Sequence, residues 1–338
     1  MSATATDQRL TGVILEIQRM STEDGPGLRT TVFFKGCGLR CAWCHNPESL
    51  VRAPELQWIE SRCIFCAQCT GACPRGALTL AGSEIVIDRE RCAGCGTCAA
   101  VCPSTALELI GAEWSDASLV DEVLKDRSYW GTTGGVTASG GEAALQAPFV
   151  ASFFRELKSR GINTALDTSG HCARGNLDMI LPFTDLVLYD LKEIDSERHR
   201  ALTGSGNEQV LENFIYTAGY VRDHLLPGGL WVRTPVIPGA TDRRDNIAGI
   251  GALIAAHAKN VVARWELCSF NNLCRDKYRR LGKRWDFAAA RLVGRDTMED
   301  LAGTARSSGV DPSIVCWSGA TDQSEEERPA AVKRPGTC

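Results

Sequence analysis

The second half of the chain alternates between two hydrophobic patterns. Short, nearly continuous apolar runs are typical of strands buried on both faces, whereas apolar residues that recur every three or four positions are typical of amphipathic helices. The clearest helical face ends at Gly161 and carries, in chain order, Phe149, Val150, Phe153, Phe154 and Leu157. The strand-like runs lie at residues 134–142, 163–170, 184–192, 230–239 and 261–267. This alternation predicts βα units that build a parallel sheet.

The first third of the chain has a different organisation. Residues 12–36 contain two apolar runs around a Gly-Pro-Gly turn, which predicts two strands joined by a tight, exposed loop. After Glu48 the sequence becomes rich in cysteine, and residues 77–80 and 84–87 alternate around a Gly-Ser pair, as the strands of a short hairpin do. The pattern predicts a main domain from residues 1–53 and 111–318, an insert at 54–110 and a disordered, charged tail at 319–338.

Composition and charge narrow the class of protein. Of the 338 residues, 44% are hydrophobic and 23% are charged, which is ordinary for a globular protein. A net charge of −4 gives no support to nucleic-acid binding, which favours a basic surface. The longest apolar run, residues 247–256, is too short to span a bilayer. Because residues 1–10 carry no secretory signal, we expect a soluble cytoplasmic monomer without a membrane or nucleic-acid partner.

The chain contains 16 cysteines, whose clustered spacing in a reducing compartment indicates metal binding rather than disulfides. Cys37, Cys41 and Cys44 follow a strand-like run at Cys-x3-Cys-x2-Cys spacing. Three thiolates can hold three corners of a 4Fe–4S cluster, which leaves one iron without a protein ligand. An open position is typical of catalytic metal sites. A structural zinc site with His45 as the fourth ligand is the alternative from spacing alone.

Two further cysteine runs share the spacing Cys-x2-Cys-x2-Cys-x3-Cys-Pro of bacterial two-cluster ferredoxins and form an internal duplication. In such units the fourth cysteine of each run binds the other cluster. The prediction is two 4Fe–4S clusters, one bound by Cys63, Cys66, Cys69 and Cys102 and the other by Cys73, Cys92, Cys95 and Cys98. Such an insert relays electrons or docks an electron donor, or else it only shapes the surface that binds a partner.

Polar residues follow the ends of three predicted strands. In chain order they are Ser139-Gly140-Gly141-Glu142, Asp167-Thr168, and Asp190 with Lys192. Because the carboxyl ends of parallel strands meet at the mouth of a barrel, these groups predict an active site there. Glycines at a strand end also let a ligand approach the backbone closely. A solvent-exposed ion pair is the alternative for Asp190 and Lys192.

The first cysteine motif resembles the signature of radical S-adenosylmethionine (SAM) enzymes, with Trp43 in its aromatic position. The segment Asp-Gly-Pro-Gly-Leu-Arg from Asp24 to Arg29 resembles the signature of the activating enzymes of glycyl radical enzymes, a narrower group of that family. The resemblance covers residues 16–282 and implies an α/β fold, an incomplete (β/α)6 radical SAM barrel with an inserted α+β ferredoxin-like domain. It implies three 4Fe–4S clusters. The open iron would bind SAM, and one electron would cleave SAM to methionine and a 5′-deoxyadenosyl radical.

The resemblance also implies roles for the residues at the strand ends. The backbone of the Gly-Gly-Glu segment, Ser139–Glu142, would hold the methionyl amino group of SAM. Lys192 would neutralise the methionyl carboxylate. Asp167, Thr168 and Asp190 would lie near that carboxylate, where the family can hold a monovalent cation.

Three further positions complete the resemblance. Arg233, in a strand similar to the family's Arg-x-Pro-x-Ile-Pro-Gly, would contact SAM or brace the mouth, and Asp24 would orient the partner backbone. The family's ribose-contacting histidine is Asn271 here, which can donate and accept hydrogen bonds but cannot titrate. Cys268 and Cys274 are predicted to be buried free thiols rather than ligands. No role is predicted for Cys172, Cys316 and Cys338.

The sequence therefore predicts an activating enzyme that reductively cleaves SAM and takes a hydrogen atom from a glycine of a partner glycyl radical enzyme. Flavodoxin or ferredoxin would supply the electron. The departure around Asn271 favours a partner of the benzylsuccinate or alkylsuccinate synthase type, with a dehydratase, decarboxylase or C–N lyase as alternatives. Three other functions stay open: a radical SAM enzyme acting on a small molecule or RNA, a plain two-cluster ferredoxin, and a zinc-organised scaffold.

Overall fold

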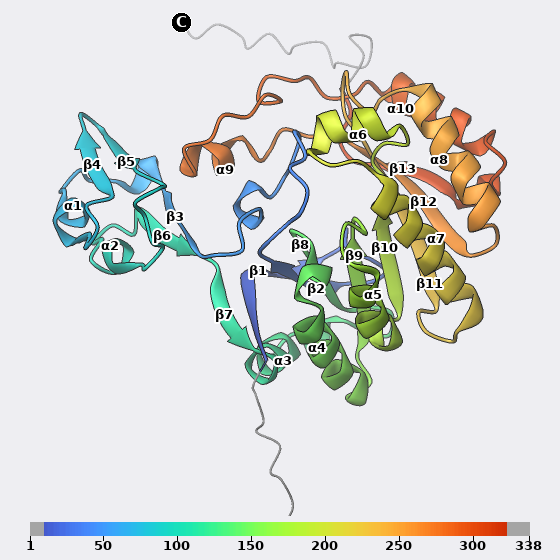
Figure 1. Ribbon diagram of the computed structural model, residues 1–338, viewed down its shortest axis with the longest axis horizontal. Helices are drawn as coiled ribbons and strands as arrows, with labels where there is room; N and C mark the ends of the chain where they lie inside the picture. Colours follow the sequence, from blue (N-terminus) through green and yellow to red (C-terminus); the bar gives the residue numbers. More distant parts are fainter. Residues whose placement is uncertain (1–9, 323–338) are drawn as a thin grey trace, which may run out of the picture.

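The computed structural model describes residues 10–322, which form a large curved sheet covered by helices and a small lobe beside it (Figure 1). The sheet has the strand order β13-β12-β11-β10-β9-β8-β2-β1-β7, and every neighbouring pair from β2 to β13 is parallel. The parallel strands are β2 (Arg29–Phe34), β8 (Gly135–Gly140), β9 (Asn163–Thr168), β10 (Leu186–Asp190), β11 (Gly229–Val236), β12 (Val262–Ser269) and β13 (Val315–Ser318). Residues 323–338 of the predicted tail lie outside the described part of the chain.

The two ends of the sheet differ. β1 (Thr11–Ser21) and β7 (Ala112–Ser115) extend it beyond β2 as antiparallel strands. At the other end β13 adds a seventh parallel strand to the six that the βα pattern predicts. Within residues 10–322 the two end strands of the sheet do not pair with each other, so the barrel is open, and the predicted incomplete radical SAM barrel is confirmed.

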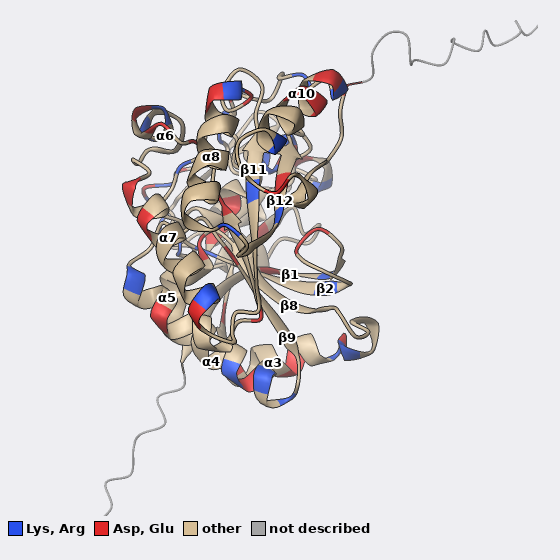
Figure 2. Ribbon diagram, turned by 90° about the vertical axis from the view of Figure 1, so that its right-hand side faces the viewer, with Lys and Arg blue, Asp and Glu red and all other residues tan. Residues whose placement is uncertain are grey.

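Helices cover the outer face of the sheet, where acidic and basic side chains are interspersed (Figure 2). They are α3 (Asp116–Leu124), α4 (Ala147–Ser159), α5 (Arg174–Ile180), α6 (Ser196–Thr203), α7 (Glu208–Asp223), α8 (Arg244–His257) and α10 (Arg295–Arg306). The predicted apolar stripe of α4 is buried, and this helix ends just before Gly161, whose φ of +72° glycine adopts without strain. Burial of such stripes against nearly continuous apolar strands produces the core, which includes Phe34, Phe153 and Trp265.

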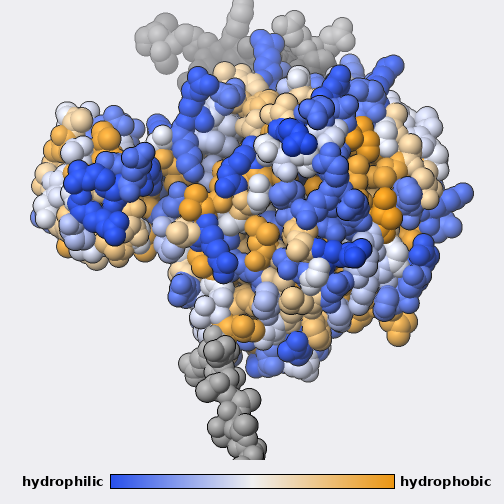
Figure 3. Space-filling model, viewed as in Figure 1, coloured by the Kyte–Doolittle hydropathy of each residue, from blue (hydrophilic) through white to orange (hydrophobic). Residues whose placement is uncertain are grey.

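The lobe comes from the segment between β2 and β7. β3 (Glu55–Trp58) pairs with β6 (Leu107–Ile110), and the predicted hairpin consists of β4 (Leu78–Ala81) and β5 (Glu84–Ile87). Two short helices, α1 (Gln68–Ala72) and α2 (Thr97–Ala100), each carry one buried cysteine. Figure 3 shows the lobe as a separate body joined to the rest of the surface at one side.

The segment that follows β12 lies between the lobe and the barrel (Figure 1). It includes α9 (Arg275–Arg280), a helix of six residues that the hydrophobic pattern did not predict. Among residues 10–322, no helix combines the length and the apolar character needed to cross a bilayer.

Candidate active site

A cavity of about 300 Å³ opens at the carboxyl ends of the parallel strands. The loop after β2, residues 35–50, forms one wall and contributes all three cysteines of the first motif together with Trp43; we call it the cluster loop. The strand ends form the opposite wall. The predicted site residues on that wall are Gly140, Gly141, Asp167, Thr168, Asp190, Lys192 and Arg233.

The cluster loop is held by backbone hydrogen bonds on both sides of its cysteines. Gly36 N donates to Ser49 O at 2.6 Å, which closes the base of the loop. Arg40 N donates to Thr203 O at 2.7 Å, and Ala42 N donates to Leu202 O at 2.9 Å, so the end of α6 supports the loop. The cysteines therefore occupy a defined wall of the cavity.

The donor set of the loop suits an iron–sulfur cluster. Burial raises the pKa of Cys37 to about 11 and that of Cys44 to about 12, and it also raises the pKa of Cys41. Without a metal these thiols stay protonated at neutral pH, so only binding of a metal centre would turn them into thiolate ligands. Three thiols at one end of a cavity that continues beyond them can hold a cluster with one iron facing free space.

A network of charges lies opposite the cysteines. Lys192 Nζ is 2.7 Å from Asp190 Oδ2, and Arg233 Nε is 3.2 Å from Asp190 Oδ1. The same guanidinium pairs with Asp167, whose other oxygen accepts from Ser139 Oγ at 2.5 Å. Two cations and two carboxylates thus face the cavity from three neighbouring strands.

The two carboxylates of this network differ in acidity. Burial raises the pKa of Asp167 to about 6, and the charge of Asp190 adds to the effect while Arg233 opposes it. Burial also disfavours ionisation of Asp190, but Lys192 and Arg233 together hold its pKa below the ordinary value. Near neutral pH, Asp190 is therefore the more firmly ionised partner of the two cations.

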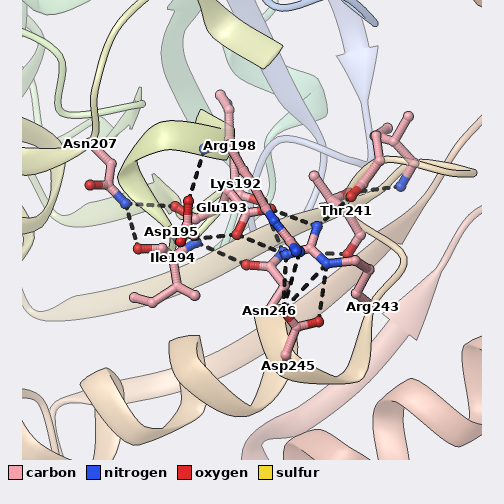
Figure 4. A network of polar contacts seen from close by, with 12 residues as sticks. Lys192, Glu193, Ile194, Asp195, Arg198, Asn207, Thr241, Arg243, Asp245 and Asn246 are labelled. Carbon is pink, nitrogen blue, oxygen red and sulfur yellow. Dashed lines mark hydrogen bonds and ion pairs between the residues drawn. The ribbon is translucent and has the colours of Figure 1, made fainter. Parts of the chain in front are cut away.

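The polar network of Figure 4 holds the backbone at and after Lys192 and so positions this side chain. Asn246 Nδ2 donates to Lys192 O at 3.2 Å, and Asn246 Oδ1 accepts from Ile194 N at 2.9 Å. Glu193 is buried and lies 2.9 Å from the guanidinium of Arg243. These contacts join the end of β10 to the start of α8, which fixes the backbone that carries Lys192 (Figure 4).

The Gly-Gly-Glu segment has two separate tasks. A Cβ on Gly140 would lie 2.4 Å from Phe34 N, and one on Gly141 would lie 2.3 Å from Gly36 O, so only glycine allows the end of β8 to pass this close to the cluster loop. The side chain of Glu142 is buried and does not line the cavity. It accepts from Thr168 Oγ1 at 2.7 Å and thereby orders the end of β9.

Besides Ser139 and Glu142, two more predicted residues, Asp24 and Asn271, lie away from the cavity lining. The carboxylate of Asp24 accepts from Ser21 Oγ at 2.5 Å and from Thr31 Oγ1 at 2.7 Å, so it shapes the loop between β1 and β2. The side chain of Asn271 accepts from Leu273 N at 3.2 Å, within its own turn. Only the carbonyl of Asn271 reaches the cluster loop, through the ring of His45 at 3.0 Å.

Sequence reasoning missed several residues that line the cavity. They are Leu39, His45, Asn46, Ser49, Leu50, Ser169, Pro235, Ile237, Cys268, Ser269 and Phe270. The residues at the ends of β11 and β12 also follow from the rule that parallel strand ends meet at a barrel mouth, but they carry no charge that would mark them as site residues. Of the two thiols predicted to be buried, Cys274 is buried beneath the cluster loop, with Sγ 3.8 Å from Cys44 O, but the prediction is wrong for Cys268, which is only partly buried and lines the cavity at the end of β12.

The lobe contains two small hollows of about 10 Å³, each lined by four cysteines. One is lined by Cys63, Cys66, Cys69 and Cys102, and the other by Cys73, Cys92, Cys95 and Cys98, the two sets grouped from the sequence. Ala77 N donates to Cys73 Sγ at 3.2 Å and Ala106 N donates to Cys102 Sγ at 3.3 Å, so the duplicated runs repeat the same N–H···S contact.

Within residues 10–322, no three cysteine, histidine or acidic side chains are placed to share a single metal ion. The ligands of a four-iron cube each bind a different iron, so they need not meet at one point. Burial raises the pKa of Cys172 and of Cys316, neither of which lines any of these hollows. Cys338 lies outside the described residues.

Comparison with known proteins agrees with this geometry. Residues 62–106 match the family model of the 4Fe-4S dicluster domain. The (2S)-3-sulfopropanediol sulfolyase activating enzyme of Bilophila wadsworthia is 40% identical over 284 residues, 83% of this chain and 92% of that relative. The trans-4-hydroxy-L-proline dehydratase activating enzyme of Clostridioides difficile is 34% identical over 304 residues, 89% of this chain and 98% of that relative.

A solved domain of a pyruvate-formate lyase-activating enzyme from Bacteroides vulgatus is similar over 55% of this chain and 99% of that one, with 21% identity and a TM-score of 0.45. An open parallel barrel with a three-cysteine loop at its mouth and a dicluster lobe defines a radical SAM enzyme with a ferredoxin-like domain. The relatives of the chain define its family more narrowly. The chain belongs to the family of glycyl radical enzyme activating enzymes.

Proposed function

We propose that this enzyme takes a hydrogen atom from a backbone glycine of a partner glycyl radical enzyme. The proposal rests on one observation: two different walls face each other across a single cavity. One wall carries the three cysteines of the cluster loop, and the other carries Lys192, Asp190 and Arg233 at the strand ends. A zwitterionic ligand that chelates a metal cluster through its amino and carboxylate groups needs both a metal wall and a wall that balances charge.

In this proposal Cys37, Cys41 and Cys44 hold a 4Fe–4S cluster, and SAM lies between it and the strand ends. A cluster held there would supply the electron for reductive cleavage of SAM to methionine and a 5′-deoxyadenosyl radical, the species that would accept the hydrogen atom of the glycine. Lys192 offsets the methionyl carboxylate, and the backbone of Gly140 and Gly141 receives the amino group. These residues bind and orient the ligand, and none of them has to transfer a proton.

The charge network supports a defined role for Arg233. Its guanidinium already lies between the carboxylates of Asp167 and Asp190, the place where a monovalent cation would otherwise be expected. We assign to Arg233 the counter-charge at this position, with a bound cation as the alternative. Thr168 contributes to this position only indirectly. Its hydroxyl donates to Glu142, and this contact orders the end of β9, the strand that also carries Asp167.

The lobe is assigned two further 4Fe–4S clusters, held by the two sets of four cysteines that line its hollows. Together with the cluster loop this gives three clusters in the chain. A small reduced redox protein such as flavodoxin or ferredoxin, in the cytoplasm, would supply the electron, and the activating enzyme would act as a monomer.

The partner belongs to the finer part of the proposal. The relatives are activating enzymes for a sulfolyase, dehydratases, sulfite-lyases and decarboxylases. They support a partner that eliminates a group from its substrate, and they do not favour the benzylsuccinate or alkylsuccinate synthase type that the segment around Asn271 suggested. We therefore assign a lyase or dehydratase of the glycyl radical class as partner.

The test is an anaerobic reaction of reconstituted enzyme with SAM, dithionite and a candidate partner, followed by electron paramagnetic resonance (EPR). A glycyl radical doublet on the partner, with 5′-deoxyadenosine formed alongside, is the expected result. A partner whose radical-site glycine is replaced by alanine is the matched control and should show no doublet. Formation of 5′-deoxyadenosine without a doublet on any eliminating partner would instead favour a radical SAM enzyme that acts on another substrate.

A further inference from the structure

The lobe meets the cluster loop at a buried lysine. Lys35, two residues before the first cysteine, has no exposed side-chain surface, and its Nζ donates to Glu48 O at 2.5 Å. The same ammonium lies 3.3 Å from Glu55 Oε2, at the first residue of β3. Gly111, at the other connection of the lobe, covers the stem, since a Cβ there would lie 2.3 Å from Cδ of Lys35. One side chain thus joins the end of the cluster loop to both connections of the lobe.

This junction depends on its charge pair. The side chain of Lys35 is fully buried, and the carboxylate of Glu55, itself only slightly exposed, lies 3.3 Å from its ammonium and offsets its charge. The second oxygen of Glu55 faces Lys283 at 4.0 Å, in the segment after β12. Removing one partner of a buried ion pair leaves an uncompensated charge, so Lys35 would be expelled or would pull its surroundings out of place.

The segment after β12, residues 270–285, holds the other side of the loop. Tyr278 donates its hydroxyl to Cys44 O at 2.9 Å, and Trp285 Nε1 donates to Ala42 O at 3.0 Å. The two aromatic rings stack with centroids 5.1 Å apart, which makes one rigid platform of both donors. Both accepting carbonyls belong to the stretch from Cys41 to Cys44, so this platform restrains the loop between its second and third cysteines.

The platform in turn rests against the lobe (Figure 1). Arg89 Nη2, in the stretch between the two cysteine runs, donates to Leu281 O at 3.0 Å, at the end of α9. Arg279 of α9 lies 3.7 Å from Glu60 of the lobe. The lobe therefore contacts the cluster loop directly through Glu55 and indirectly through α9.

We propose that the ferredoxin-like lobe is a brace for the cluster loop, with Lys35, Glu55 and Tyr278 as positioning residues for the open cluster. This role rests on the proposed function, because the brace acts on the SAM-binding cluster, and it is independent of electron transfer by the lobe. Outer contacts of this kind orient metal ligands and tune the metal centre. An intact lobe is then a condition for correct geometry at the SAM site.

The test compares Glu55→Gln with Glu108→Gln in the fully reconstituted protein. Glu108 is the matched control, because it pairs with Arg62 at 2.5 Å inside the lobe, on β6, with both side chains well exposed. We expect E55Q to keep the iron content of the wild type but to raise the Kd for SAM about tenfold. Hydrogen exchange at residues 36–48 should accelerate, and the EPR spectrum of the SAM-bound reduced cluster should change.

E108Q should match the wild type in all four measurements: iron content, Kd for SAM, hydrogen exchange and EPR spectrum. Equal behaviour of E55Q and E108Q would overturn the brace. If E55Q does not assemble its clusters, Tyr278→Phe decides, since it removes only the hydroxyl that reaches Cys44 O and should produce the same changes in smaller degree. Failure of the proposed function is distinguishable, because hydrogen exchange is measured without SAM and without a partner protein.

Discussion

The barrel and the lobe both carry cysteines spaced for iron–sulfur clusters, but they depend on them in opposite ways. The barrel has an extensive apolar core of aromatic and aliphatic side chains that holds its strands and helices without help from Cys37, Cys41 or Cys44. The core of the lobe consists of Leu56, Leu78, Ile85, Leu107, Cys69 and Cys98. A domain this small has a limited apolar core, so the clusters assigned to it would complete that core.

The cavities of the barrel and of the lobe differ in the same way as their cores. The hollows of the lobe hold about 10 Å³ each and are closed by four cysteines, whereas the barrel cavity holds about 300 Å³ and has three cysteines on one wall. Complete ligand sets around closed sites stabilise structure or carry electrons, and incomplete sets beside free space bind substrates. One kind of ligand thus serves as a fold-forming element in one region and as a reactive surface in the other.

The sharpest way to separate the regions is to remove one ligand from the open site. Cys41→Ala should abolish reductive cleavage of SAM and lower the iron content by about four atoms per chain, while the lobe keeps its clusters. Iron analysis and the yield of 5′-deoxyadenosine measure both effects. The comparison fails if C41A still cleaves SAM, or if the lobe loses its iron as well.

The reciprocal change removes a ligand from the lobe. Cys98→Ala should eliminate protection from hydrogen exchange throughout β3–β6, because Cys98 lies in the small core and is assigned to a cluster that would complete it. Strands β8–β12 should keep their protection. Proteolysis offers an independent check, with cleavage expected between residues 55 and 110. A lobe that stays protected in C98A would mean that its apolar residues suffice.

A smaller effect tests the charged wall. Lys192→Met should raise the Kd for SAM by roughly thirtyfold, about 2 kcal/mol, because a buried ammonium that pairs with the methionyl carboxylate is lost. Binding of methylthioadenosine, which lacks that carboxylate, should not change. Lys125→Met is the control, since Lys125 pairs with Glu122 on the surface. Equal weakening of both ligands by K192M would place the lysine elsewhere in the site.

The smallest effect concerns pH. Burial raises the pKa of Asp167 to about 6 from an ordinary 3.8, so the stability that this carboxyl contributes is present below pH 3.8 and is lost as pH rises through 6. The free energy of unfolding of Asp167→Asn, compared with that of the wild type, should therefore rise between pH 4 and pH 7, by on the order of 1 kcal/mol. Thermal unfolding of both proteins without SAM measures the gain. A constant difference across this range would show that Asp167 titrates normally.

Local patterns predicted the parallel βα sheet and the cysteine motifs, and the family resemblance added the incomplete barrel. The strands β8 to β12 are nearly continuous apolar runs, and the cysteines lie in short motifs with fixed spacing, so both can be recognised locally. The exchange of the fourth cysteine between the two runs of the lobe follows from the known arrangement of two-cluster ferredoxins. Helix α9, the buried junction of Lys35 with Glu55, and the inward turn of Glu142 were not predictable. They arise from contacts between segments far apart in sequence, which periodicity does not record.

The two supports of the cluster loop have a consequence for the order in which the protein is made. The loop is synthesised early, but it rests on the end of α6 near residue 203 and on Tyr278 and Trp285. During translation the cluster loop therefore cannot make all of its supporting contacts until residues 278 and 285, in the last quarter of the chain, have left the ribosome. The lobe is contiguous, from Glu55 to Ile110, and can receive its iron while synthesis continues. The segment that forms the lobe is thus complete well before the cluster loop can make all of its supporting contacts.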